Sequence, residues 1–316
     1  MGAGRLENFI FSINVALPIL FVILIGLFLK KRGFLDQNAI SALDKFSFRV
    51  GMPLLMFKNI SEMDFYAEFS LKFILFCAIF SLATFLIIWF VALRLFPDRP
   101  AAGSFAQGSV RGSVSVLGVS IVANIYGTAG IAAVMISATV PIYNAMSIII
   151  LTCCGTSGKV RLRDIVHSIF TNPLVIGILC GLPFALLRIE VPEAAASTVD
   201  TLSATATPLA LIVIGASFNR ADATARLRPA LLATLIKLVI MPCIGMPIAI
   251  WLGFRDAALT SLLLMTSTAT APASYIMARN MGCDGPLASN IVLLSTMFFS
   301  FTLAAWLFAL RSLGLI

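Results

Sequence analysis

Residues 266–275 read Thr-Ser-Thr-Ala-Thr-Ala-Pro-Ala-Ser-Tyr, and they interrupt an apolar run that extends over residues 257–278. Pro272 lacks a backbone N–H, and its ring clashes with the preceding turn, so a helix cannot pass through it undisturbed. Small and hydroxyl-bearing residues before this proline are typical of an unwound stretch that lines a polar cavity. The segment therefore predicts a helix that is broken near Pro272.

The composition of the whole chain places this segment in a membrane. The 316 residues are 60% hydrophobic and 11% charged, with a mean hydropathy of +1.03, whereas soluble domains are about 45–50% apolar and about 25% charged. These values exclude an ordinary soluble enzyme, a disordered chain and a small disulfide scaffold. A helix needs about 20 apolar residues to span a bilayer, so ten spans use about 200 residues and leave short loops.

Charged residues and turn signals divide the apolar runs into ten candidate spans. This pattern predicts an all-α polytopic membrane protein with ten transmembrane helices. The approximate cores of the spans are residues 9–29, 38–57, 71–96, 104–126, 130–153, 165–187, 195–218, 229–252, 257–278 and 286–310.

Basic residues are distributed unequally over the two sets of loops between these spans. The loops after odd-numbered spans hold 12 of the 22 Lys and Arg residues, and the termini and the other loops hold 6. Because cytoplasmic loops carry an excess of Lys and Arg, we expect both termini on the non-cytoplasmic side of the membrane. The net charge is +8, but no basic run exceeds Lys30–Arg32, so we expect no nucleic-acid partner.

A shift of 155 residues aligns the first half of the sequence with the second. Five pairs of Gly or Pro residues match at this one offset, namely Pro18 with Pro173, Gly26 with Gly181, Pro53 with Pro208, Gly127 with Gly282 and Gly130 with Gly285. The alternative is coincidence in a biased composition. Because each half, 1–155 and 156–316, contains an odd number of spans, the halves are expected to be inverted repeats, which are typical of secondary transporters.

The fourth span carries the second candidate break. Residues 108–120 contain three glycines and no proline, and Leu117 is the repeat partner of Pro272, so we predict that breaks at these two positions meet near the membrane midplane. A broken helix presents backbone N–H groups and a positive dipole end at the start of its second half. Two such starts at one point form an anion site. The alternative is that Pro272 only kinks a packed helix.

At these residues the chain resembles the auxin efflux carrier family, which includes bacterial transporters described as malonate transporters and the plant PIN carriers. The resemblance covers essentially the whole length. It implies ten helices in two inverted five-helix repeats, crossing broken helices four and nine, and transport of organic anions. The segments that carry it are Pro18–Gly26, Gly33–Leu35, Met52–Phe57, Arg111–Gly118, Asn144, Asn172–Leu174, Pro208–Ala210 and Pro272.

The chain departs from the family pattern in the fourth span. Ser113 stands where the family has an asparagine, and Ser120 stands where it has a proline. Ser113 lacks an amide that would donate to a carboxylate, and Ser120 does not force a break as proline does. The candidate substrate-binding residues are Arg111, Ser113, Gly118, Ser120, Asn144, Thr270, Pro272 and Ser274, with Leu117 and Pro272 as the helix-break positions.

Ionisable residues inside spans are functional candidates by default. Arg111 either pairs with a carboxylate or reaches back to lipid headgroups. Lys237 either has a functional partner or extends to the cytoplasmic face, and the second is slightly favoured. Asp44 and Asp200 are the acids nearest the membrane, where each is either a carrier of a coupling proton or an interfacial residue. The Asn144 amide bonds another helix or contacts substrate.

These features predict a carrier for small organic anions such as malonate or auxin-like acids, as a uniporter or coupled to protons. The alternative is a sodium-coupled symporter for bile-acid-like or keto-acid substrates, which has a similar ten-helix architecture. An intramembrane enzyme is not favoured, because the chain has one histidine, His167, and neither HExxH nor GxSxG. We expect no metal and no cofactor. The lipid bilayer is the expected environment, and exposed apolar helix faces are compatible with a homodimer.

Overall fold

The computed structural model describes residue 18 and residues 21–62, 71–127, 130–155, 171–218 and 224–316. These residues are almost entirely helical, and they contain no strand beyond one isolated bridge. The prediction of an all-α protein is therefore confirmed. Most of the first expected span lies outside the described residues, although residues 21–31 are helical.

The first half contains α2, α3, α4, α5, α6 and α7, with two short π-helical segments, η1 and η2. Their bounds are α2 Gln37–Phe46, η1 Ser47–Gly51, α3 Met52–Ser61, α4 Leu71–Leu95, α5 Arg99–Val110, η2 Val114–Gly118, α6 Val119–Tyr126 and α7 Gly130–Gly155. The chain is helical without a break from α2 to the end of α3, and it leaves the helical path between α5 and η2.

The second half contains α9, α10, α11, α13, α14, α15, α16 and α17, with one π-helical segment, η3. Their bounds are α9 Pro173–Leu187, α10 Glu193–Ala204, α11 Ala206–Ala216, α13 Leu227–Leu235, η3 Ile236–Ile240, α14 Met241–Trp251, α15 Asp256–Ser267, α16 Ala273–Asn280 and α17 Gly285–Ser312. The helical path is lost again between α15 and α16.

Helix starts follow local sequence signals. Asp36, Asn172 and Asp284 each occupy an N-cap, and each side-chain oxygen accepts a backbone N–H of the first turn. Proline follows at the first or second position of α9 and α17, where its missing N–H costs no helical hydrogen bond. The side-chain oxygen of Asn172 is therefore a helix cap.

Five helical stretches in the described part of the chain are long and apolar enough to cross a membrane. Many of their apolar side chains are exposed, as for Ile79 and Phe90 on α4. A helix that is apolar on all sides is suited to lipid rather than water. The five stretches are Leu71–Leu95, Ile131–Gly155, Glu193–Ala216, Leu227–Trp251 and Gly285–Ser312.

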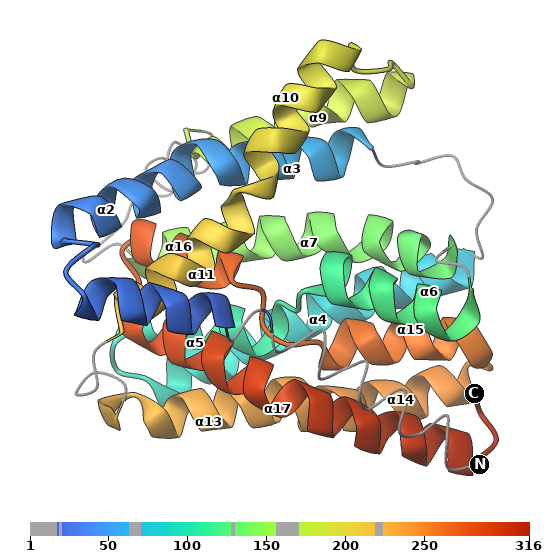
Figure 1. The fold of residues 1–316 in the computed structure, drawn as a ribbon. Helices are drawn as coiled ribbons and strands as arrows, with labels where there is room; N and C mark the ends of the chain where they lie inside the picture. The colour runs from blue at the N-terminus through green and yellow to red at the C-terminus, as the bar shows by residue number, and fades with distance from the viewer. Residues whose placement is uncertain (1–17, 19–20, 63–70, 128–129, 156–170, 219–223) are drawn as a thin grey trace.

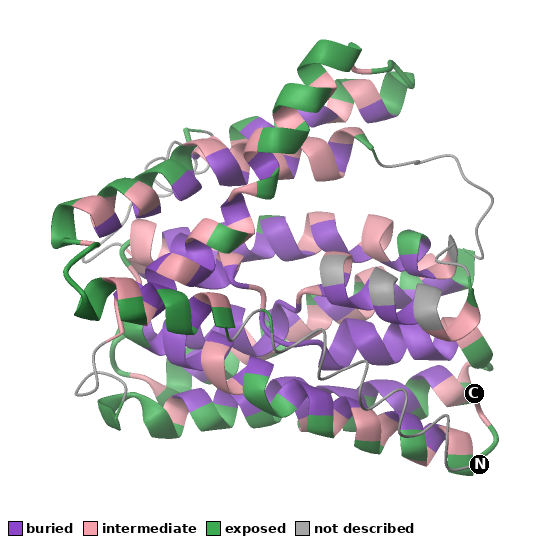
Figure 2. Cartoon of the chain, viewed as in Figure 1, coloured by how far each residue is buried: buried purple, intermediate pink, exposed green. Residues whose placement is uncertain are grey.

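The helices form two groups (Figure 1). In one group α3 packs on α9 and α10. In the other, α4, α5 and α7 pack together, and α13 packs on α17 and α14 on α15. A large apolar core joins the second group, and a smaller core connects α2, α3 and α11 to α16. Figure 2 shows that burial is concentrated on α7 and α15, between the outer helices, while much of α10 is exposed.

Glycine allows α9 to lie directly against α3. A Cβ atom on Gly177 would overlap the backbone carbonyl of Pro53. Small residues at such positions let helix backbones approach closely, which is how helices pack inside membranes. Gly215 of α11 lies in the same way against the carbonyl of Ile23.

Replacing Gly177 by valine is expected to lower the thermal unfolding midpoint in detergent, because the side chain must push α9 away from α3. Overpacking of this kind costs about 1–3 kcal/mol. Gly285→Ala is the control, since a Cβ there meets side-chain atoms at 3.5 Å or more. Equal midpoints for the wild type and Gly177→Val would contradict the close approach.

Candidate functional site

Two non-helical segments lie at the centre of the site. The first is Arg111–Ser113, where α5 has ended and the Arg111 backbone is extended, with φ −70° and ψ 101°. The second is residues 268–272, which begin with extended backbone at Thr268 and end at Pro272, the N-cap residue of α16. We call these two segments together the crossover.

The two segments of the crossover pair with each other as a short antiparallel bridge between Gly112 and Thr270. The Ser113 N–H donates to the Ala269 carbonyl at 2.9 Å, and the Ala271 N–H donates to the Arg111 carbonyl at 3.3 Å. Backbone groups that leave a helix inside a membrane need partners, because an unpaired group there is costly. Each segment therefore supplies the partners of the other.

The position of the first interruption differs from the prediction. Leu117 lies inside η2 and is buried, and its N–H donates to the Ser113 carbonyl at 3.0 Å. The chain leaves the helix at Arg111–Ser113 instead. No proline is needed there, because the extended backbone is held by its bonds to the second segment. The second non-helical segment ends at Pro272, the N-cap residue of α16.

A cavity of about 230 Å³ adjoins the crossover. Four of the predicted residues line it, namely Arg111, Ser113, Asn144 and Pro272. Four further polar residues that line it, Asn59, Ser115, Tyr143 and Thr207, were not predicted from sequence. Thr207 directly precedes Pro208, which matches Pro53 in the internal repeat. This position is the sequence feature that could have indicated Thr207 as a site residue.

Arg111 is buried, with 5% of its surface exposed, so the headgroup interpretation is wrong. Its guanidinium donates to Asn144 Oδ1 at 2.8 Å and contacts the Met277 sulfur at 2.9 Å. These partners are neutral, and no carboxylate among the described residues forms an ion pair with Arg111. Within the described residues, the positive charge of Arg111 beside the cavity therefore has no acidic partner.

The side chain of Asn144 lies next to this charge and has one used and one unused hydrogen-bonding atom. Its Oδ1 atom is used by Arg111, whereas its Nδ2 atom is buried and has no hydrogen-bond partner within the described chain. A buried amide donor without a partner costs free energy. Asn144 thus holds a donor ready for a hydrogen-bond acceptor that enters the cavity.

Thr270, Ser274 and Gly118 are not among the described residues that line the cavity. Thr270 supports the crossover, because its hydroxyl donates to the Gly108 carbonyl at 2.8 Å and its N–H donates to Ser295 Oγ at 3.0 Å. Ser274 is buried in the first turn of α16, and its hydroxyl has no partner in the described part of the chain. Gly118 ends η2. Ser120 lies in α6, and its side chain is outside what the structure describes.

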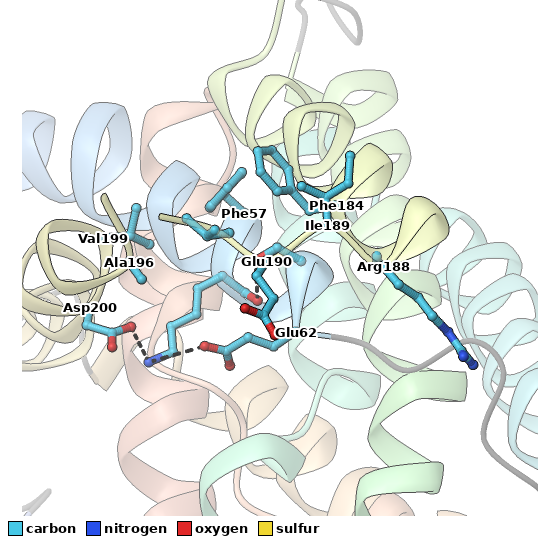
Figure 3. A pocket seen from close by; sticks show the side chains of 13 residues that line it. Phe57, Glu62, Phe184, Arg188, Ile189, Glu190, Ala196, Val199 and Asp200 are labelled. Atoms are coloured by element: carbon cyan, nitrogen blue, oxygen red, sulfur yellow. Dashed lines mark hydrogen bonds and ion pairs between the residues drawn. The ribbon is translucent and has the colours of Figure 1, made fainter. Parts of the chain in front are cut away.

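The two predicted acids lie away from the cavity. Asp44 is buried on α2, where Oδ2 is 3.1 Å from Arg279 Nε of α16 and Oδ1 accepts from Asn280 at 3.0 Å. Asp200 is exposed on α10, and it pairs with Lys58 Nζ at 2.5 Å. This pair lines an open cleft of about 680 Å³ between α3, α9 and α10 (Figure 3).

Lys237 does not extend to the cytoplasmic face, and that prediction is wrong. Its side chain is completely buried in η3. The ammonium group donates to the Val110 carbonyl at 2.8 Å and to the Met265 carbonyl at 3.2 Å. Lys237 therefore lies directly behind the crossover, on the side where α5 and α15 end.

Comparison with known proteins agrees with this description. A family model described as "Membrane transport protein" matches residues 11–307. An uncharacterized transporter of Methanothermobacter thermautotrophicus is 24% identical over 302 residues, which cover 94% of this chain and 98% of that protein. The chain is therefore an integral membrane protein that belongs to the membrane transport protein family, the family of the auxin efflux carriers that its motifs resemble.

Proposed function

We propose that this protein carries small organic anions across the membrane and binds them at the crossover. The observation that carries the proposal is the pair formed by Arg111 and Asn144. The guanidinium has no acidic partner among the described residues, and the Asn144 amide nitrogen has no acceptor there. A carboxylate that entered the cavity would satisfy both groups at once, because it accepts several hydrogen bonds and compensates the charge.

Helix ends add to this preference for an anion. The segment η2 begins at Val114 and α16 begins at Ala273, directly after the two non-helical segments of the crossover. The first N–H groups of a helix have no partner within it and carry a positive partial charge. Gly112, Ser113 and Ala273 line the cavity, so these positive ends lie beside the proposed substrate.

The size of the cavity favours a short substrate. Sites for drug-sized ligands measure about 300–1,000 Å³, and the cavity here is smaller, at about 230 Å³. A malonate-like dicarboxylate or a small aromatic acid suits this volume, whereas a steroid acid does not. This supports the organic-anion carrier over the bile-acid type of symporter.

We further propose that the chain crosses the bacterial inner membrane ten times, as two inverted five-helix repeats, residues 1–155 and 156–316. In this arrangement α5 with η2 and α6 is the broken fourth span, and α15 with α16 is the broken ninth. Alternating access would expose the crossover to each side in turn. The Asp44–Arg279 ion pair joins α2 to α16 and would close the cytoplasmic path in the state described.

Arg111→Ala is expected to reduce carboxylate uptake by proteoliposomes at least about tenfold, because a charge-assisted hydrogen bond contributes about 1.5–3 kcal/mol. Arg111→Lys should recover part of the uptake, since lysine keeps the charge but not the planar fork. The assay uses radiolabelled malonate first and then a panel of mono- and dicarboxylates.

Arg94→Ala is the matched control, because Arg94 is exposed at the end of α4 and stacks on Phe90. It should transport as the wild type does. If no carboxylate in the panel is taken up, or if Arg111→Ala transports at the wild-type rate, the proposed function is wrong.

The proposed topology predicts that both termini face the non-cytoplasmic side. Single cysteines at Gly2 and Ile316, in a variant without the six native cysteines, should both react with a membrane-impermeant maleimide added outside intact cells. Protection of one terminus and labelling of the other would require an odd number of spans and would exclude the two five-helix repeats.

A further inference from the structure

The proposed substrate site leaves the most deeply buried charge of the described chain without a role. Lys237 has no exposed surface and does not line the cavity beside the crossover. No carboxylate within the described ranges forms an ion pair with it. An ammonium group in this position is costly unless other groups stabilise it, so its surroundings indicate what it does.

The partners of Lys237 are the C-terminal ends of two different helices. Val110 is the last residue of α5, and Met265 lies in the last turn of α15. Their carbonyls accept from Lys237 Nζ at 2.8 Å and 3.2 Å. The last carbonyls of a helix have no partner within it and carry a negative partial charge. One ammonium group therefore compensates both negative ends.

The neighbouring residues enclose this position. The Tyr143 hydroxyl also donates to the Met265 carbonyl, at 3.1 Å. Gly112 packs against Lys237, and a Cβ atom on Gly112 would meet both the lysine Nζ atom and Thr268 Oγ1. The ammonium group is thus enclosed next to Gly112, on the side of the crossover where α5 and α15 end.

Transporters with interrupted helices use such places for coupling ions. Carbonyls of unwound backbone and the C-terminal ends of half-helices commonly coordinate Na⁺, while the N-terminal ends face the anionic substrate. In this chain Arg111 and the helix N-termini lie on the cavity side of the crossover, and Lys237 lies at the C-terminal ends. Lys237 therefore lies at the helix C-terminal ends, the kind of position at which such transporters coordinate Na⁺.

We propose that the Lys237 ammonium group is a built-in cation that takes the place of a coupling sodium ion, so that this carrier works without Na⁺. Lys237 is a positioning residue, because it holds the ends of α5 and α15 together and does not contact the substrate cavity. The proposal rests on the proposed function in treating the crossover as the transport site. It adds that the driving force does not include a sodium gradient.

The test measures thermal unfolding of purified full-length protein in detergent, in NaCl and in choline chloride at equal ionic strength, without substrate. The wild type should unfold at the same temperature in both salts. In choline chloride, the unfolding midpoint of Lys237→Ala should be at least about 5 °C below that of the wild type, because the carbonyl ends of two helices lose their cation. Sodium should restore part of that loss by entering the vacated space.

Two further variants separate charge from packing. Lys237→Met fills the space without a charge, so it should be destabilised in both salts and should not respond to sodium. Lys72→Ala is the matched control, because Lys72 also donates to a helix-end carbonyl, that of Leu252, but at an exposed position. Its midpoint should be independent of the choice of salt.

Stabilisation of the wild type by sodium, or a Lys237→Ala midpoint that equals the wild type or ignores sodium, would overturn the proposal. If Lys237→Ala does not fold, uptake by the wild type with and without a sodium gradient tests the proposal. Uptake that requires a sodium gradient is incompatible with a built-in cation. These readouts are independent of the substrate. Failure of the carboxylate uptake assay with a sodium-independent wild type would therefore reject the proposed function and leave the role of Lys237 standing.

Discussion

Backbone hydrogen bonding in an apolar environment is the constraint on which the centre of this protein depends. Two helices end inside the molecule, at Val110 and Ser267, and their free backbone groups must find partners where water is scarce. The extended segments satisfy each other through the bridge between Gly112 and Thr270. Side chains from elsewhere, above all Lys237, satisfy the carbonyl ends. The bonds of the crossover therefore satisfy backbone groups that the two helix ends leave without helical partners.

The same arrangement separates charge on the two sides of the crossover. Behind it, the positive charge of Lys237 is compensated by the negative ends of two helices. On the cavity side, the described partners of the Arg111 charge are the Asn144 oxygen and a methionine sulfur. Two buried cations therefore have different consequences. One stabilises the fold, and the other leaves a net positive field in a small cavity.

A residue that acts through its own covalent structure is the easiest to interpret from sequence. Pro272 removes an N–H wherever it lies, and the second interruption ends there. Leu117 lies inside a helical segment, because the first interruption depends on bonds to Ala269 and Ala271 and not on a breaker residue. The placement of Lys237 was wrong for a related reason. Lysine side chains in membrane helices usually extend to the membrane surface, whereas Lys237 donates to a carbonyl 127 residues away in the chain.

The sequence by itself determined the helical membrane class and the family, because hydropathy and motif order are local properties. It also predicted Arg111 and Asn144 as candidate binding residues, but it did not predict their contact with each other. Only the tertiary structure decided that Asp44 pairs with Arg279, that Asp200 lies on the outer cleft and that Asn59 and Thr207 line the cavity. Those facts depend on which distant helices are in contact. The sequence of one helix is compatible with many neighbours, and only tertiary packing decides which of them it contacts.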